Sequence, residues 1–397
     1  MPRRAYQILV CLAAALLGYL SIAVTAANTF ASAAPSLALG FWPSAVAEAR
    51  TADAMILGNP RARTFDGPAA HALTALRRNP TLAVASRVLA LQALTRRDER
   101  LAARLFEYSE GVSRRDVPTQ LWLLEQQVQR NDIPGALEHF RIVLRVSPGA
   151  RELLFPVLTG ALAEDYLVAP IANRAFGEPW EEAFLRYAST NARDPVDAAK
   201  VIMLLARRGS TPPADMVQGI SGRLIEHGRL DVAGRLYRLI DPQWNPNDIE
   251  RQLDGGFTRS EDLPPFGWTL AQDVAFRGAP VGAAADNPAL NVSAEQAVDG
   301  SVARKLLLLR PGRYRLAGRF GVVEREGDWQ LAIGIACGEA ATPVLSPATP
   351  LAGNGGAFNA EFTVPAGCRA PWLSLNLDRS GGGRIQFWVD DLRLSGR

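Results

Sequence analysis

The spacing of apolar residues changes once along this chain of 397 residues, close to residue 245. Between residues 43 and 245, Ala and Leu recur three to four positions apart, which predicts amphipathic helices. After that point Gly and Pro become frequent and apolar residues alternate with polar ones, as at Leu331, Ile333 and Ile335. Alternation places every second side chain on one face of a strand. We therefore predict a multidomain chain with an α-helical domain at residues 43–245 and an all-β domain at residues 250–397.

A charge-free apolar segment, residues 8–27, is preceded by Arg3 and Arg4. At about 1.5 Å per residue a helix of this length matches the hydrocarbon core of a bilayer. The two arginines indicate that residues 1–7 remain in the cytoplasm. We predict a single-pass signal anchor, a linker at residues 28–42, and a periplasmic location for the rest of the chain. The small residues Ala-Ser-Ala at 31–33 leave a cleaved signal peptide as the alternative.

The composition indicates a bacterial source, so we expect the anchor to lie in the bacterial inner membrane. Lys200 and Lys305 are the only lysines, whereas Arg, Ala and Gly are abundant, as is typical of a GC-rich genome. The formal net charge is only +3 and is spread along the chain. A nucleic-acid partner is not expected, because it would need basic residues clustered on one face.

Within the helical domain, matching residues recur 34 positions apart, from Asn79-Pro80 through Ser113-Arg114 to Ser147-Pro148. A small residue followed four positions later by an aromatic ring places both on one helix face. Three such pairs are predicted to pack between helices: Ala102 with Phe106, Ala136 with Phe140, and Ala233 with Tyr237. The spacing is lost between about residues 151 and 230, where the helical pattern continues.

This pattern resembles the tetratricopeptide repeat family, whose unit is a helix–turn–helix of about 34 residues. The resemblance implies a solenoid of stacked helix pairs whose concave face binds other proteins, here proteins of the cell envelope. Candidate residues for that face, with plain solvent exposure as the alternative, are Arg87, Gln92, Gln120, Glu125 and Gln127. The isolated histidines, predicted to lie on helix surfaces without metal-ligand spacing, are His71, His139 and His227.

Short alternating segments separated by Gly and Pro predict an antiparallel sandwich after residue 250. It opens on Gly255-Gly256-Phe257 and Gly267-Trp268, and it closes on Val389-Asp390-Asp391-Leu392. These segments resemble carbohydrate-binding modules of the galactose-binding-like jelly-roll type. The resemblance implies that the first and last strands lie side by side, that a polysaccharide is the ligand, and that tryptophans stack on its sugar rings. The candidates, with core packing as the alternative for each, are Trp268, Trp372 and Trp388.

The same resemblance implies a structural calcium ion at Asp390, held together with an acidic residue just after Phe257. Thr258 stands at that second position, so one expected carboxylate is missing, and calcium prefers several oxygen ligands. Hydrogen bonding at the end of the strand is the alternative role for Asp390. No other cofactor is expected.

Cys337 and Cys368 lie in the all-β part, and an exported chain can keep a disulfide. Such a bridge would close a loop of about thirty residues and would contribute on the order of 3–4 kcal/mol by constraining the unfolded chain. Two buried free thiols are the alternative.

Sequence motifs of catalysis are missing: there is no nucleophile elbow, phosphate-binding loop or dinucleotide fingerprint. We therefore expect no enzyme. The sequence favours a membrane-anchored scaffold that binds proteins through its helices and a polysaccharide through its sandwich, in the assembly or export of cell-surface polysaccharide. Two alternatives remain, a purely structural adaptor and a carbohydrate-active enzyme whose carboxylate pair is recognisable only in three dimensions.

Overall fold

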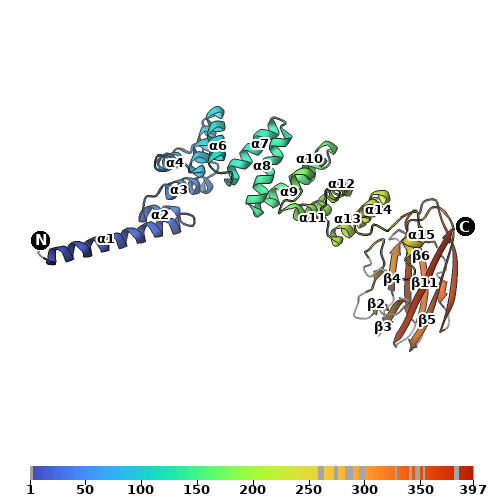
Figure 1. The fold of residues 1–397 in the computed structure, drawn as a ribbon. Coiled ribbons are helices and arrows are strands. Elements are labelled where there is room, and N and C mark those ends of the chain that lie inside the picture. Colours follow the sequence, from blue (N-terminus) through green and yellow to red (C-terminus); the bar gives the residue numbers. More distant parts are fainter. Residues whose placement is uncertain are drawn as a thin grey trace. The chain divides into compact units, whose positions relative to one another are not determined.

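The computed structural model describes residues 3–257, 263–271, 276–281, 289–294, 300–326, 329–338, 342–344, 349–351, 354–379 and 384–396. Across these residues helices come first and strands follow (Figure 1). The helices are α1 (Arg3–Phe30), α2 (Pro35–Phe41), α3 (Ala45–Gly58), α4 (Asp66–Arg78), α5 (Ala83–Thr95), α6 (Glu99–Val112), α7 (Val117–Gln129), α8 (Ile133–Val146), η1 (Pro148–Ala150), α9 (Arg151–Ala161), α10 (Asp165–Ala175), α11 (Glu181–Asn191), α12 (Pro195–Ala206), α13 (Ala214–Glu226), α14 (Leu230–Tyr237) and α15 (Ile249–Leu253).

The chain divides into two compact units. The first comprises Met1–Leu158 and Ala169–Glu181, and the second comprises Thr159–Val168 and Glu182–Arg397. Helices give way to strands between α15 and the first strand, close to the predicted change near residue 245. The second unit nevertheless includes α11, from Glu182 on, and α12 to α15 together with all the strands.

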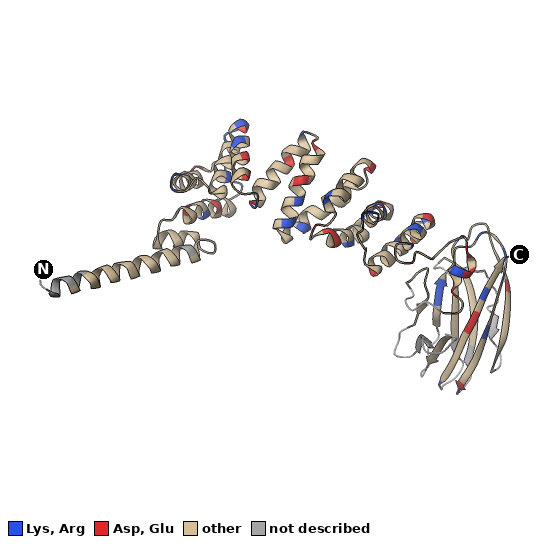
Figure 2. Ribbon diagram, in the orientation of Figure 1, with Lys and Arg blue, Asp and Glu red and all other residues tan. Residues whose placement is uncertain are grey.

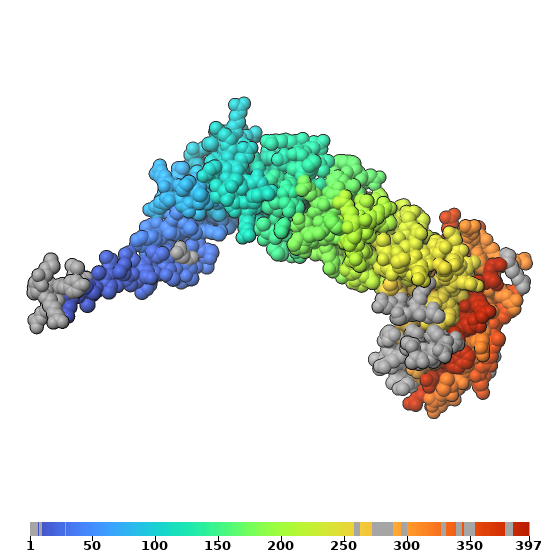
Figure 3. Space-filling model, viewed as in Figure 1, coloured from blue at the N-terminus to red at the C-terminus, as the bar shows by residue number. Residues whose placement is uncertain are grey.

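The apolar helix α1 opens the first unit. Its segment Val10–Ala27 has a mean hydropathy of 2.1 and is long and apolar enough to cross a membrane, by length and composition alone. Most of its side chains are exposed (Figure 3). The predicted linker contains the short helix α2, which packs against α1. Small residues permit this close approach, since Ala31, Ala38 and Ala47 share one buried cluster.

The next helices pack as neighbours along the chain, α3 with α4, α5 with α6, and α7 with α8. Helices α5, α7 and α9 begin at residues 83, 117 and 151, which keeps the 34-residue spacing of the sequence. Asp98 and Asp132 cap α6 and α8 by accepting hydrogen bonds from the N–H groups of Leu101 and Gly135. Such caps satisfy backbone donors that a helix start leaves without partners.

The small and aromatic residues singled out at helical spacing are all buried: Ala102, Phe106, Ala136, Phe140, Ala233 and Tyr237. Phe106 shows why the ring lies there. It shares a core cluster with Ala90 of α5 and Leu123 of α7, and its ring stacks on Trp122 with 4.2 Å between centroids. One side chain of α6 thus joins the helices before and after it.

The second unit contains two antiparallel sheets. The strands are β1 (Thr269–Leu270), β2 (Phe276–Val281), β3 (Ala289–Ala294), β4 (Gly300–Leu306), β5 (Gly312–Arg325), β6 (Trp329–Cys337), β7 (Thr342–Pro343), β8 (Thr349–Leu351), β9 (Gly355–Val364), β10 (Pro371–Arg379) and β11 (Ile385–Gly396). The first sheet has the order β1-β4-β10-β6-β7, with β8 also on β6, and the second has the order β2-β3-β11-β5-β9.

A single hydrophobic core lies between the two sheets. It combines inward side chains of the first sheet, such as Ile333 and Leu375, with those of the second, such as Leu316 and Phe387. Each such buried side chain contributes about 1.5–3 kcal/mol through removal from water. The predicted alternation at Leu331, Ile333 and Ile335 is confirmed, because all three point into this core. The all-β region is therefore a sandwich.

A disulfide joins Cys337, at the end of β6, to Cys368 in the turn before β10, with 5.8 Å between the Cα atoms. This confirms the predicted bridge. The expected pairing of the first and last strands is wrong for the described strands, because β1 pairs with β4 in one sheet and β11 pairs with β3 and β5 in the other. The last strand instead contacts the turn after α15, where the Leu392 N–H of β11 donates to the Gly255 carbonyl over 3.0 Å. The Gly-Gly-Phe segment forms a turn after α15 and not a strand.

Helix α14 is joined to the sandwich by an aromatic cluster inside the second unit. Tyr237, Trp244 and Phe266 are each at most 2% exposed, and their ring centroids lie 4.8 to 5.4 Å apart. The buried Gln252 adds polar contacts, since its Nε2 donates to the Leu308 carbonyl over 3.2 Å and its Oε1 accepts from the Leu308 N–H over 2.8 Å. These contacts fix α15 to the segment after β4.

Candidate functional site

The outer face of the first sheet carries a row of polar and aromatic side chains on β10. Trp372, Ser374 and Asn376 alternate with the core residues Leu373, Leu375 and Leu377 and are only half-buried. Their partners across β6 are small, since Trp372 pairs with Ala336, Ser374 with Gly334, and Asn376 with Ala332. The β10 side chains thus stand above a low strip of β6.

Hydrogen bonds hold this row in place. The Asn376 Nδ2 donates to the Ser374 Oγ over 3.0 Å, and the Ser374 Oγ donates to the Gly334 carbonyl over 3.4 Å. Gly334 is needed for this arrangement, because a Cβ atom there would lie 2.8 Å from the Ser374 Oγ. The Asn376 amide has a second N–H donor and an Oδ1 acceptor, which can bind a ligand on this face.

Trp372 borders a cavity of about 980 Å³. The guanidinium carbon of the exposed Arg304, on β4, lies 4.9 Å from the centre of its ring, which is within the range of a cation–π interaction. The cavity is also lined by Thr269 of β1, by Arg369 beside the disulfide, and by Glu226 of α13. This volume lies at the upper end of the range of small-molecule sites.

The three candidate tryptophans do not share a site. Trp268 is 1% exposed and packs on Phe257 with 5.2 Å between centroids, so its ring cannot stack on a ligand in this structure. Trp388 lies on the outer face of the other sheet, across Gly321, where a Cβ atom would come within 2.5 Å of the indole. Trp372 alone of the three borders the cavity of the first sheet.

Asp390 is 6% exposed, and its Oδ1 accepts a hydrogen bond from the Asp391 N–H over 2.6 Å. It lies where the pairing of β11 with β5 is interrupted. Thr258 lies outside the described residues. Within the described residues no three His, Cys, Asp or Glu side chains converge as a metal site would require. The calcium ion stays a prediction.

Two of the residues predicted to line a concave helical face are buried instead. Arg87 is 4% exposed, with guanidinium nitrogens 2.9 Å from the Asp53 carboxylate and 2.8 Å from that of Asp116. Gln120 is fully buried, and its Oε1 lies 2.7 Å from the His139 Nδ1. The prediction of exposure was wrong for these residues, because each faces a polar partner on another helix.

His139 is likewise not the surface residue that was predicted. The residue is 7% exposed, and this burial lowers the pKa of the imidazole below its ordinary value, against the opposing effect of the Glu110 carboxylate. The hydrogen bond with Gln120 suits a neutral ring whose Nδ1 carries the proton. His139 therefore acts as a packed polar contact between α7 and α8.

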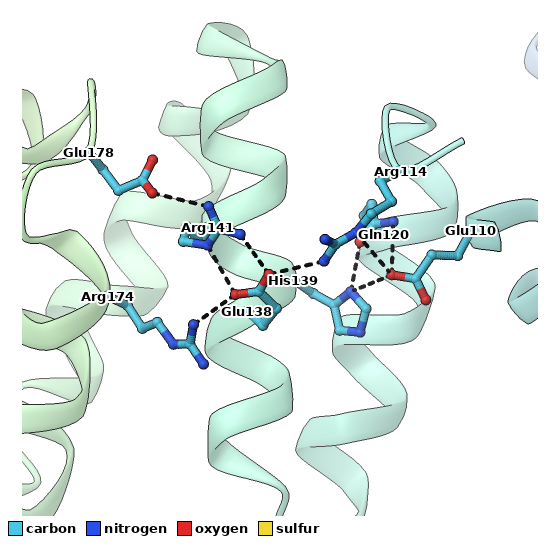
Figure 4. A network of polar contacts seen from close by, with 8 residues as sticks. All are labelled: Glu110, Arg114, Gln120, Glu138, His139, Arg141, Arg174 and Glu178. Carbon is cyan, nitrogen blue, oxygen red and sulfur yellow. Dashed lines mark hydrogen bonds and ion pairs between the residues drawn. The ribbon is translucent and has the colours of Figure 1, made fainter. Parts of the chain in front are cut away.

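Glu138 is the centre of an ion-pair network in the first unit (Figure 4). Its carboxylate lies 2.6 Å from Arg141, 2.8 Å from Arg174 and 3.0 Å from Arg114. Hydrogen bonds from Arg141 are the largest cause that lowers its pKa, to about 2. Arg141 also reaches Glu178 over 3.1 Å.

The network joins α8 to α10 and to the loops beside them, with three arginines balanced by the carboxylates of Glu110, Glu138 and Glu178. Positive and negative residues are also mixed across the array of helices from α3 to α14 (Figure 2). Balanced charge indicates a structural role and not an anion site. No sequence signal marks this network, because its members are up to 68 positions apart.

No protein-family model and no curated protein matches the sequence. Solved structures do match part of it. One described as "CBM4 structure and function" is 14% identical over 34% of this chain and 96% of its own, with a TM-score of 0.25. The TmCBM61 complex with beta-1,4-galactotriose is 16% identical; the match covers 36% of this chain and 97% of that one, with a TM-score of 0.28. The CBM22-1 xylan-binding domain of Paenibacillus barcinonensis Xyn10C is 11% identical; the match covers 33% of this chain and 85% of that one, with a TM-score of 0.25. A likeness this distant assigns no ligand to the chain.

Proposed function

We propose that this chain is a membrane-anchored, non-catalytic carbohydrate-binding protein. Its sandwich binds a polysaccharide on the outer face of the β1-β4-β10-β6-β7 sheet. The observation that supports this most is the half-buried Trp372 ring, which stands in one row with Ser374 and Asn376 and borders the large cavity.

The chemistry of that row suits a sugar chain. An indole ring offers a large apolar surface on which the C–H face of a pyranose can stack. Ser374 and Asn376 provide donors and acceptors for hydroxyl groups. The low strip of Ala332, Gly334 and Ala336 beside them leaves space for an extended polymer.

Helix α1 supports the proposed anchor in the inner membrane, with the rest of the chain in the periplasm. Beyond its apolar segment, Phe30, Phe41 and Trp42 are all exposed, and the rings of Phe30 and Phe41 stack with 5.9 Å between centroids. Exposed aromatic residues at the end of a spanning helix are typical of the bilayer interface. We therefore place α2 at the periplasmic surface of the membrane.

Docking of proteins by a tetratricopeptide-like array of helices is the second proposed activity. The 34-residue spacing of helix starts supports it, and so does one apolar face. Leu153 and Val157, one turn apart on α9, are 60% and 54% exposed. A protein that both docks partners and holds a polysaccharide would fit the assembly or export of cell-surface polysaccharide. An adaptor without sugar binding would use only the helical face.

A glycan array tests the proposal, with full-length wild-type protein in detergent beside Trp372→Ala. The control is Val323→Ala, whose side chain is 62% exposed on the other sheet. We expect wild type and the control to bind at least one polysaccharide, and Trp372→Ala to lose about tenfold in affinity. Absence of binding to every glycan would favour the adaptor, and equal binding by all three proteins would exclude the Trp372 face.

A further inference from the structure

A second cavity, of about 540 Å³, lies beside the first within the same compact unit. Four arginines line it: Arg235, Arg238, Arg310 and Arg369. Among the described residues of the lining Asp231 is the one acidic side chain, and it is already paired with Arg235 over 3.1 Å. The cavity therefore carries an excess of positive charge from its other three arginines.

The guanidinium groups of Arg238, Arg310 and Arg369 make no ion pair with any described residue. All three side chains are exposed, so they keep their donors available for a ligand. Guanidinium groups bind carboxylates through two parallel hydrogen bonds, which makes them suited to a planar anion.

The chain around each of these arginines is firmly held. Arg238 follows Tyr237 of the aromatic cluster, and Arg369 follows the disulfide-bonded Cys368. The Leu309 N–H donates to the Arg369 carbonyl over 3.2 Å, which ties the segments that carry Arg310 and Arg369 together. Because the backbone at these positions is already fixed, ligand binding costs less conformational entropy there.

The two cavities adjoin, because Gly228, Leu230 and Arg369 line both. A chain stacked on Trp372 could thus continue past Arg369 to Arg310 and Arg238. We infer that the arginine cavity binds carboxylate groups of an acidic, uronate-containing polysaccharide. The inference rests on the proposed carbohydrate binding and names its ligand class. A nucleic acid is disfavoured because Trp372 is the one aromatic ring among the described residues that line the two cavities, whereas bases stack on a row of rings.

The test measures affinity of the detergent-solubilised full-length protein for polygalacturonate and for the same polymer after reduction of its carboxyl groups. Arg238→Gln/Arg310→Gln removes two charges from the arginine cavity without touching the first cavity. Arg193→Gln/Arg208→Gln removes the same charge from exposed residues elsewhere. Single-stranded DNA serves as the competing polyanion, and near-UV circular dichroism verifies the fold of each variant.

We expect wild type to prefer the acidic polymer at low salt. The cavity double variant should lose about tenfold in affinity for it and keep its affinity for the reduced polymer. Equal loss in the control double variant, or DNA binding as tight as that of polygalacturonate, would overturn the inference. Trp372→Ala separates the two proposals. If this variant loses affinity for both polymers and wild type binds them equally well, only the inference about the arginine cavity is wrong. If the arginine variant loses affinity for the acidic polymer but Trp372→Ala does not, the proposed binding face at Trp372 is wrong.

Discussion

The backbone N–H of Leu392 donates to the Gly255 carbonyl over 3.0 Å. This hydrogen bond joins β11, the last strand of the sandwich, to the turn that follows α15. The approach depends on glycine, since a Cβ atom at residue 255 would lie 1.8 Å from the Leu392 carbonyl oxygen. Around this contact Asp254, Phe257 and Asp391 adopt positive φ angles of 43°, 49° and 55°. Non-glycine residues adopt such angles only where the surroundings hold them there.

Replacing Gly255 with Ala should therefore destabilise the sandwich by about 1–3 kcal/mol, because backbone must move to admit the new methyl group. Urea unfolding followed by near-UV circular dichroism measures the change. The matched control is Gly367→Ala, since a Cβ at Gly367 would meet nothing within 4 Å. An equal urea midpoint for the two variants would contradict the close approach.

Reduction of the Cys337–Cys368 disulfide should lower the free energy of unfolding of the sandwich by about 3–4 kcal/mol. The bond closes a sequence separation of 31 residues, so its loss frees that loop in the unfolded chain. Unfolding with and without reductant measures the effect, and Cys337→Ser/Cys368→Ser should match the reduced protein. Alkylation of three thiols in the untreated native protein, and not of Cys11 alone, would contradict the bridge.

Arg87→Ala should destabilise the first unit by about 3–5 kcal/mol, because the mostly buried carboxylates of Asp53 and Asp116, with side chains 14% and 8% exposed, lose their shared cation. The comparison is Arg100→Ala, at an exposed position on α6. Thermal unfolding followed by far-UV circular dichroism reports the difference. If both variants melt like wild type, the buried ion pair is not formed.

Glu138→Gln should change the response of the first unit to acid. The folded pKa of Glu138 is about 2 against an ordinary value of 4.5. Its contribution to stability is therefore fully present above pH 4.5 and is lost as pH falls through about 2. Urea unfolding at pH 2 to 7 should show a shallower decline for Glu138→Gln than for wild type. The exposed Glu99→Gln serves as the control and should follow wild type; parallel curves for all three would exclude the network.

Periodicity in the sequence was sufficient to predict the two structural classes. Alternation placed Ile333 inward on its strand, and the small-then-aromatic spacing selected Ala102 and Phe106, which are buried. Both patterns report which face of one element is apolar. They are local, and they hold whatever the element packs against.

The same patterns could not choose among the tryptophans or identify the buried polar residues. Trp372 and Trp388 both alternate with core residues, and only the sheet order places them on opposite outer faces. Arg87 looks like surface until Asp53, 34 positions earlier, is brought beside it. The arginine cavity is likewise assembled from residues 235 to 369, whose proximity depends on the aromatic cluster at Trp244.

Binding of carbohydrate at Trp372 is tested most directly by isothermal titration calorimetry, with an oligosaccharide of the polymer selected on the glycan array. Wild-type protein should bind it with one saturable site. Trp372→Ala, folded as judged by circular dichroism, should bind about tenfold more weakly or not measurably. Identical dissociation constants for the two proteins would contradict the account.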